Sequence, residues 1–166
     1  GRGCPFQCTY CSNHALKKIA SGSYVRFRSP FNIIEEIKEI VADYPTKRDF
    51  YLEVETMGVN KKWDFELCSK LEQLNTTLDK PLNFGVNLRI ASNVDYENLF
   101  VKFRNCNFKF VNIGLESGSE RVRREILRRN YTNNDIVNAV NLAKKNGLKV
   151  NFFNIIGIPG ETLTDF

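Results

Sequence analysis

Apolar residues recur at helical spacing in the first long segment of the chain. Ser29 and Pro30 suit an N-cap and a first helical position, and Pro45 ends the pattern. The apolar positions between them are Ile33, Ile34, Ile37, Ile40, Val41 and Tyr44. Because this spacing places the side chains on one helical face, the pattern predicts an amphipathic helix between Pro30 and Pro45.

Short apolar runs then alternate with further helical patterns. The predicted strands are 50–56, 82–90, 108–115 and 149–157. The predicted helices start after Asn60, cover 95–103 and 119–129, and start again at a capping box of Thr132 and Asp135. Nearly continuous apolar strands that alternate with helices are typical of a parallel sheet covered by helices. The pattern therefore predicts an α/β fold, as in an α/β barrel or a doubly wound sheet.

Both ends of the chain look cut. No strand precedes the first residues, and another helix should begin at 162–166. A closed eight-unit barrel needs about 250 residues, whereas this chain has 166. We therefore expect a partial barrel, truncated at both ends, with residues 1–166 forming part of one domain.

The composition is that of an ordinary globular domain. Hydrophobic residues make up 42% of the chain and charged residues 26%, which is enough for a real core. No run of roughly 18 apolar residues predicts a membrane span, and the first residues do not form a secretory signal. We expect no membrane association and a cytoplasmic location.

The net charge of +5 has two readings. A basic chain can bind nucleic acid or a phosphorylated substrate. The excess gathers in one predicted helix, as Arg121, Arg123, Arg124, Arg128 and Arg129. Glu120 and Glu125 interrupt this run and no nucleic-acid motif accompanies it. We therefore interpret the arginines as a solvated helix face and predict no nucleic-acid partner.

Clustered cysteines give the chain its clearest chemistry. Five cysteines are present, and Cys4, Cys8 and Cys11 fall within eight residues. An odd, clustered set is poor disulfide design and indicates metal ligation in a reducing compartment. Three thiolates on a 4Fe-4S cluster would leave one iron without a protein ligand. The alternatives are a zinc site, or an electron-transfer cluster completed by Cys68 or Cys106.

Several motifs together resemble one family. The segment CPFQCTYC, with Tyr10 before its last cysteine, resembles the CxxxCxxC signature of the radical S-adenosylmethionine (SAM) superfamily. NIGLESGS at 112–119 and IIGIPGET at 155–162 are similar to its fourth- and fifth-strand segments. YVRFRSP and LAKKNGL resemble the subgroup that often carries an upstream cobalamin-binding domain. The resemblance implies a TIM-barrel-like core in which these strands are the second to the fifth.

The resemblance also implies an activity. In the family a 4Fe-4S cluster reductively cleaves SAM, and the 5′-deoxyadenosyl radical abstracts hydrogen from a substrate. The expected cofactors are the cluster, SAM and, in an upstream domain, cobalamin, which would suit a methyltransferase. The expected partners are an unknown substrate and an electron donor such as flavodoxin or ferredoxin. The alternative is a non-catalytic iron–sulfur or metal-binding module.

Polar and glycine residues follow each predicted strand, where barrel active sites are built. By resemblance, Glu116 and Ser117 would bind the ribose and methionine portions of SAM. Gly157 and Gly160 would let the backbone approach the adenine. Tyr10 would lie against the adenine or the cluster, or simply shield the cluster from solvent.

Two further candidates have open alternatives. The family often has GGE where this chain has VETM, so Glu55 is expected either to hold the SAM amino group or to be a salt-bridged strand end. Arg89 is expected to bind the SAM carboxylate or an acidic substrate.

Other notable residues have structural interpretations. We expect Cys68, Cys106 and Trp63 to be packing residues and His14 to be a solvated loop residue. The phenylalanines Phe108, Phe110, Phe152 and Phe153 are expected in the strand core rather than as a base-stacking platform.

Overall fold

The computed structural model describes residues 2–55 and 57–165. Its elements are α1 (Asn13–Ile19), α2 (Pro30–Asp43), β1 (Asp49–Leu52), α3 (Lys61–Thr76), β2 (Asn83–Leu88), α4 (Tyr96–Asn105), β3 (Phe108–Glu116), the π-helical η1 (Val122–Ile126), α5 (Asn133–Lys145), β4 (Lys149–Asn154) and the 3₁₀-helical η2 (Leu163–Asp165). Strands and helices alternate from β1 to β4, which confirms the predicted α/β class.

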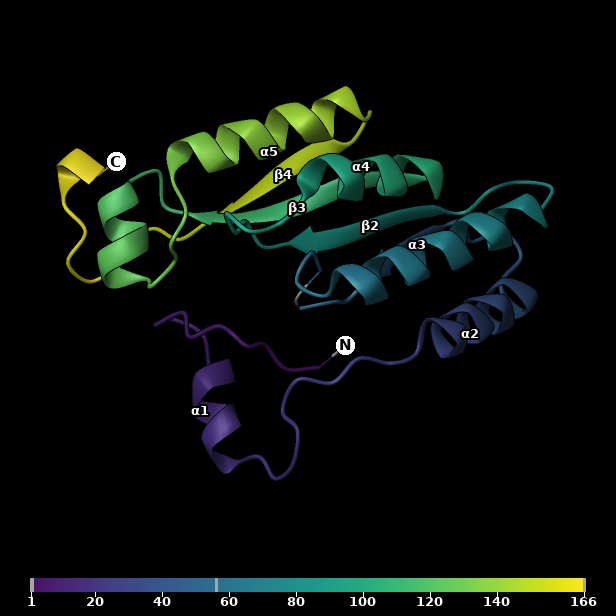
Figure 1. Cartoon of the computed structure of the whole chain (residues 1–166), viewed down its shortest axis with the longest axis horizontal. Coiled ribbons are helices and arrows are strands. Elements are labelled where there is room, and N and C mark those ends of the chain that lie inside the picture. Colours follow the sequence, from purple (N-terminus) through teal and green to yellow (C-terminus); the bar gives the residue numbers. More distant parts are fainter. Residues whose placement is uncertain (1, 56, 166) are drawn as a thin grey trace.

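The four strands form one parallel sheet in the order β1-β2-β3-β4. Figure 1 shows α3, α4 and α5 side by side along one face of this sheet, with α2 beside α3. The segment that precedes α1 lies at the end of the sheet where the strands finish (Figure 1). Residues at the carboxyl ends of β1, β2 and β3 therefore meet the N-terminal segment, through Glu55, Arg89 and Glu116.

Alternation along the strands divides the sheet into two faces. Phe84, Val86 and Leu88 of β2 are buried against the helices, as are Val111 and Ile113 of β3. Residues between them, such as Asn87 and Asn112, are only partly buried. Because successive side chains of a strand point to opposite faces, the core lies between the sheet and the helices, and the other face is open.

Local signals in the sequence act as predicted at the helix starts. The Ser29 hydroxyl accepts a hydrogen bond from the Asn32 N–H at 3.2 Å, and Pro30 is the first residue of α2. Thr132 and Asp135 form both halves of a capping box at α5. Each cap satisfies backbone N–H groups that the first helical turn leaves without partners.

Several predicted strands end earlier than expected. β1 ends at Leu52, so Glu55 lies in the following loop, and Thr56 lies outside the described residues. β2 ends at Leu88 and β4 at Asn154. Apolar residues therefore continue past the last paired residues of these strands into the following loops. A hydrophobicity pattern alone does not distinguish such loop residues from strand residues.

Two short helices differ from the prediction. The predicted helix 119–129 is a π-helical turn, Val122–Ile126, followed by Arg128 in the left-handed region. The helix α1 was not predicted, because it has no buried residue and therefore no amphipathic pattern. Within the described residues, no helix has the length and apolar character that crossing a membrane requires.

Candidate functional site

Hydrogen bonds hold the cysteine loop at its start and in its middle. Arg2 and Arg26 form an antiparallel bridge with two backbone hydrogen bonds of 2.8 Å. The Thr9 hydroxyl donates to the Ile126 carbonyl at 2.7 Å, which ties the loop to the segment after β3. Within the loop, the Cys11 N–H donates to the Cys8 carbonyl at 3.1 Å. These bonds position the cysteines before any metal is bound.

Gly3 is needed where the chain enters this loop. Its φ is +79°, and a Cβ there would lie 2.3 Å from the Tyr24 carbonyl oxygen. Its N–H donates to Oε1 of Glu55 at 3.3 Å. A side chain at this position would be strained at this φ and would clash with Tyr24, so the glycine allows the loop to pass close to the Tyr24 backbone.

The three clustered cysteines line one cavity of about 250 Å³ at the carboxyl ends of the strands. All three are free thiols; Cys8 is buried, and Cys4 and Cys11 are partly buried. The predicted residues Tyr10, Glu55, Arg89 and Glu116 line the same cavity. The structure therefore brings together seven of the ten predicted site residues, from positions distant in sequence.

Arg89 lies directly beside the cysteines. Its Nη1 donates to Sγ of Cys8 at 2.7 Å, and its guanidinium carbon lies 3.9 Å from the centre of the Phe6 ring. Burial raises the pKa of the Cys4 thiol, although the backbone N–H of Phe6 and the charge of Arg89 oppose this shift. A fixed cation favours the thiolate form that metal ligation needs.

Glu55 connects the loop after β1 to the cysteine loop. Its Oε2 accepts a hydrogen bond from Nδ2 of Asn13 at 2.7 Å, in addition to the bond from Gly3. Asn13 in turn accepts from the Tyr24 hydroxyl. Within the described residues Glu55 forms no ion pair, so the salt-bridged alternative is not what this structure shows.

Glu116 takes part in a buried polar cluster. Its backbone has a φ of +65°, at a register shift in the β3–β4 pairing. Its Oε1 accepts from the Tyr10 hydroxyl at 2.8 Å and from Nη1 of Arg129 at 2.7 Å. Arg129 also donates to the Tyr10 oxygen at 2.6 Å and, through Nη2, to the Gly114 carbonyl at 2.9 Å. The strained backbone places this carboxylate in the cavity wall.

The surroundings keep the Tyr10 phenol protonated. Burial raises its pKa, the positive charge of Arg129 opposes that shift, and the hydrogen bond to Glu116 raises the pKa further. Tyr10 therefore acts here as a hydrogen-bond donor to a carboxylate rather than as an acid.

Arg129 is a site residue that the sequence analysis missed. It lines the cavity, and its side chain is 5% exposed in the ion pair with Glu116. Arg123 is fully buried and donates to the Ser117 carbonyl at 2.6 Å. The prediction of a solvated face was therefore wrong for these two arginines. No local pattern distinguishes them, because the helix ends at Ile126 and Arg128 takes a left-handed conformation before Arg129.

The remaining predicted residues lie beside this cavity rather than in it. Ser117 is buried and lines a neighbouring cavity of about 200 Å³, which shares Glu116 with the first. Gly157 and Gly160 have φ values of +79° and +84°. Among the described residues, neither glycine lines either cavity. The N–H of Gly157 donates to Glu161 at 3.2 Å and so shapes the loop after β4.

Cys68 and Cys106 lie away from the cysteine cavity. Both are buried in the core cluster, with exposed fractions of 1% and 0%, and neither lines the cavity. Trp63 is also buried, as predicted. His14 lies in α1 rather than in a loop, and its buried Nδ1 has no hydrogen-bond partner within 2–55 and 57–165.

The prediction that four phenylalanines form the strand core was partly wrong. Phe108 is buried, but Phe152 and Phe153 are 42% and 52% exposed. Both belong to β4, which is the last strand of the sheet. Phe153 lines the cysteine cavity, so its ring is available to a ligand.

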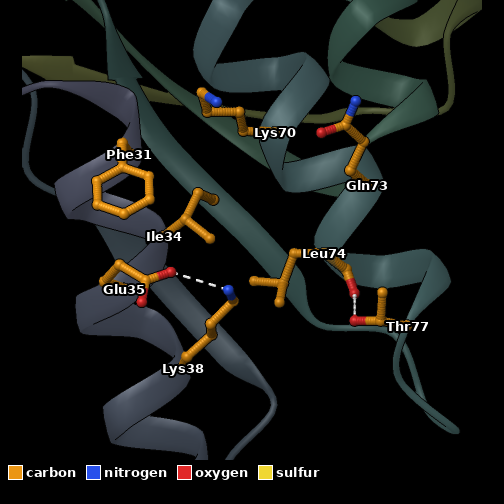
Figure 2. A pocket seen from close by; sticks show the side chains of 8 residues that line it. All are labelled: Phe31, Ile34, Glu35, Lys38, Lys70, Gln73, Leu74 and Thr77. Atoms are coloured by element: carbon orange, nitrogen blue, oxygen red, sulfur yellow. Dashed lines mark hydrogen bonds and ion pairs between the residues drawn. The ribbon is translucent and has the colours of Figure 1, made fainter.

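A separate cavity of about 290 Å³ lies between α2 and α3 in the helix layer. Figure 2 shows its apolar wall of Phe31, Ile34 and Leu74, and the ion pair between Lys38 and Glu35 at its rim. None of the predicted site residues lines it. The chemistry of the chain therefore concentrates in the cysteine cavity.

Comparison with known families gives a match over the whole chain. The family model described as the radical SAM superfamily matches residues 1–166. An uncharacterized methyltransferase of Pyrococcus horikoshii is 30% identical over 97% of this chain and 32% of its own length. The tRNA-2-methylthio-N(6)-dimethylallyladenosine synthase of Clostridioides difficile is 26% identical over 98% of this chain and 34% of its own. The chain thus spans about a third of these relatives.

Solved structures show the same fold. The radical SAM methyltransferase TsrM of Kitasatospora setae superposes with a TM-score of 0.80 at 18% identity, covering 99% of this chain and 30% of that one. The cobalamin-dependent SAM radical enzyme OxsB superposes with a TM-score of 0.74 at 15% identity, over 93% of this chain and 23% of that one. The four-stranded sheet therefore corresponds to part of the TIM-barrel-like fold of these enzymes.

Proposed function

The chain belongs to the radical SAM superfamily, and from this membership we propose that Cys4, Cys8 and Cys11 hold a 4Fe-4S cluster that cleaves SAM. One observation carries the proposal: three free thiols line a single cavity at the strand ends, while Cys68 and Cys106 are packed in the core. A cluster held by these three thiolates keeps one iron open to a small molecule.

The residues of the cavity fit such a cluster. The Nε atoms of Arg89 and Arg129 are buried without partners in the described part of the chain. Unpaired buried donors favour an anionic group, such as a thiolate-bound cluster or a carboxylate.

When bound, the cluster supplies one electron that breaks a carbon–sulfur bond of SAM and yields a 5′-deoxyadenosyl radical. The chain itself binds and orients SAM and the substrate, and it excludes water from the cavity. Arg89 lies beside Cys8 and lines the cavity, so its guanidinium is placed for the SAM carboxylate. Glu55 faces the cysteine loop and is the carboxylate proposed for the SAM amino group.

The other side of the cavity is proposed for the nucleoside portion of SAM. Glu116 is fixed by Arg129 and Tyr10, which leaves its second oxygen for a ribose hydroxyl. Ser117 lines the adjoining cavity and would contact the methionine or ribose portion. Gly157 and Gly160, in the loop after β4, would let backbone lie against the adenine. Tyr10 would cover the cluster on this side.

The reaction of the whole protein is proposed to be a radical methylation or a related transfer that uses cobalamin. Three named similarities support this proposal. The Pyrococcus relative is called a methyltransferase. TsrM is a radical SAM methyltransferase whose structure holds cobalamin, and OxsB is a cobalamin-dependent SAM radical enzyme. The substrate is not specified by these similarities.

An acidic one-electron donor such as flavodoxin or ferredoxin is proposed to approach the outer side of the cysteine loop. A groove of about 560 Å³ lies there, lined by Gln7, Thr9, His14, Lys17, Lys18 and Arg128. Gln7 and Thr9 flank Cys8 in sequence, so a donor seated in the groove lies close to the cluster. Basic side chains steer an acidic partner toward this surface.

The proposal is tested by the products of the reduced enzyme. Anaerobically reconstituted full-length protein should contain the iron and sulfide of a 4Fe-4S cluster and release 5′-deoxyadenosine from SAM. Cys68→Ser and Cys106→Ser should retain the cluster. If either variant lost the cluster while remaining folded, the electron-transfer alternative with four protein ligands would replace this proposal.

A further inference from the structure

Asn13 contacts both a clustered cysteine and a carboxylate of the cysteine cavity. It is the first residue of α1, and it lines the cavity. Its Nδ2 donates to Sγ of Cys11 at 3.5 Å and to Oε2 of Glu55 at 2.7 Å. An amide nitrogen carries two hydrogens, so it can serve both acceptors at once. Asn13 therefore joins the cysteine loop to the loop after β1 through a single nitrogen.

The neighbours of Asn13 fix the orientation of its amide. A carboxylate oxygen accepts hydrogen bonds but does not donate them, so the amide must turn its nitrogen toward Glu55. The amide oxygen accepts from the Tyr24 hydroxyl on the other side. A flipped amide would turn its oxygen toward Glu55 and Cys11 and would lose both bonds. Glu55 and Tyr24 thus hold Asn13 in the orientation that donates to Cys11.

Neither packing nor helix capping accounts for Asn13. The helix α1 has no buried residue, and Asn13 is only partly buried. The N-cap of α1 is Ser12. Within the described residues, the side chain of Asn13 bonds only to Cys11, Glu55 and Tyr24. These partners belong to the site and its border, so the amide serves the site rather than the helix.

Each clustered cysteine has its own hydrogen-bond donor. The donors are Nη1 of Arg89 for Cys8, the backbone N–H of Phe6 for Cys4, and Nδ2 of Asn13 for Cys11. Hydrogen bonds to the ligand sulfurs help to set the reduction potential of an iron–sulfur cluster. Reduction adds one negative charge, so a donor stabilises the reduced form more than the oxidised form. Among these three donors, only Asn13 also bonds to Glu55 in the described part of the chain.

We propose that Asn13 is a positioning residue that raises the reduction potential of the cluster through Cys11 and orients Glu55 for the SAM amino group. This inference rests on the proposed function, because it needs a cluster on Cys11 and SAM beside Glu55. A neutral amide suits both tasks. A cationic side chain at this position would compete with the SAM ammonium group for the Glu55 carboxylate.

The action on Cys11 is tested by the midpoint potential of the cluster in the full-length holoprotein. Electron paramagnetic resonance follows the reduced cluster during a titration with dithionite and redox mediators, without SAM. Asn13→Leu has a similar shape but no donor, so one-electron reduction should become about 10-fold less favourable, which lowers the potential by about 59 mV. Asn13→Asp should lower it further, because its carboxylate adds negative charge beside the cluster. Asn141→Leu, at an exposed position of α5, is the matched control and should leave the potential unchanged.

The action on Glu55 is tested by SAM binding to the oxidised holoprotein, which lacks the electron needed to cleave SAM. Calorimetry measures the dissociation constant. Asn13→Leu should weaken SAM binding about 5-fold, because Glu55 loses the hydrogen bond that holds its Oε2. Tyr24→Phe retains Asn13 and should change both quantities in the same direction but by less, because only the bond to Oδ1 is lost.

Two results would overturn the inference. A wild-type potential in Asn13→Leu with full iron content would show that Asn13 does not act on Cys11. Unchanged SAM binding in the same variant would show that Asn13 does not orient Glu55. If Asn13→Leu held no cluster, the isosteric Asn13→Asp and the milder Tyr24→Phe would decide, and a wild-type potential in both would contradict the proposal.

Failure of this inference is distinguishable from failure of the proposed function. Iron content and the release of 5′-deoxyadenosine with excess dithionite are recorded on the wild-type protein. Their absence would contradict the cluster proposal. Their presence, together with equal potentials in the wild type and the Asn13 variants, would contradict only the role of Asn13.

Discussion

The two faces of the sheet have the same strands but opposite chemistry. Toward the helices, Phe84, Val86 and Val111 are almost completely buried among apolar neighbours. On the open face, Asn87 and Arg89 alternate with them and line the cysteine cavity. The comparison shows that the two-residue period of a strand assigns each side chain either to the core or to the ligand site.

This division predicts which substitutions will lower the free energy of unfolding and which will impair ligand binding. Apolar burial contributes about 25 cal/mol per Å², so the helix-covered face should dominate the free energy of unfolding. Side chains of the open face should matter mainly for cluster and ligand binding. The buried pair of Glu116 and Arg129 is the exception on the open face, because removing one partner would leave a buried charge.

The largest effect is expected at the cysteine loop. Cys4→Ser, Cys8→Ser or Cys11→Ser should each abolish cluster incorporation, because three thiolates are the whole protein ligand set. The visible absorbance and iron content of reconstituted protein measure this. Cys68→Ser is the matched control from the helix-covered face and should keep the cluster. A cluster that survives in all three variants would contradict the assignment.

A matched pair of phenylalanines separates the two faces directly. Phe84, which is 1% exposed, packs near Phe50 and Phe108, so Phe84→Ala should destabilise the domain by about 3–5 kcal/mol. Phe153→Ala should cost less than about 1 kcal/mol, because its ring is half exposed. Denaturant unfolding measures both. Equal losses of stability would show that β4 is as much part of the core as β2.

A carboxyl group on the helix side should make stability depend on pH. Burial raises the pKa of Asp64 to about 7, although the Gly58 N–H opposes this shift. Between pH 3.8 and about 7 the unfolded chain loses this proton while the folded protein keeps it. The free energy of unfolding should therefore fall as pH rises through this range. One unit of pKa difference corresponds to about 1.4 kcal/mol, so the fall should be a few kcal/mol at most.

Asp64→Asn tests that dependence, since the amide cannot ionise. Its stability should fall less than that of the wild type when melting temperatures are compared across this pH range. Asp79→Asn, at an exposed position, is the control and should follow the wild type. A wild-type protein that gained stability over the same range would contradict the account of Asp64.

The smallest effect is expected at the basic groove. Replacing both Lys17 and Lys18 with glutamate should slow cluster reduction by flavodoxin hydroquinone about 10-fold at low salt, because steering is lost. Reduction by dithionite should not change. The double replacement at Lys144 and Lys145 of α5 is the matched control. Stopped-flow bleaching of the cluster measures the rates, and equal slowing with dithionite would indicate damage to the cluster instead.

The sequence predicted the parts of the molecule that depend on local patterns. Helix caps at Ser29 and Thr132 and the alternation of apolar runs locate α2, α5 and the four strands, because these signals involve neighbouring residues. The cysteine loop was also recognisable, since its ligands lie close together in the chain.

The sequence did not predict interactions between distant segments. Arg129 bonds to Tyr10 across 119 residues, and nothing local distinguishes it from its exposed neighbour Arg128. Phe153 has the hydrophobicity of a core residue, but it lies on the open face of β4, where it lines the cysteine cavity and is half exposed. Which face of a strand is open is a property of the assembled sheet.

Electron paramagnetic resonance of the reduced full-length protein, with and without SAM, tests the central claim most directly. The account predicts that SAM changes the signal of the reduced cluster, because an iron without a cysteine ligand would be open to SAM. A reduced 4Fe-4S signal that stays identical at saturating SAM would show that no iron is open, and would contradict the account.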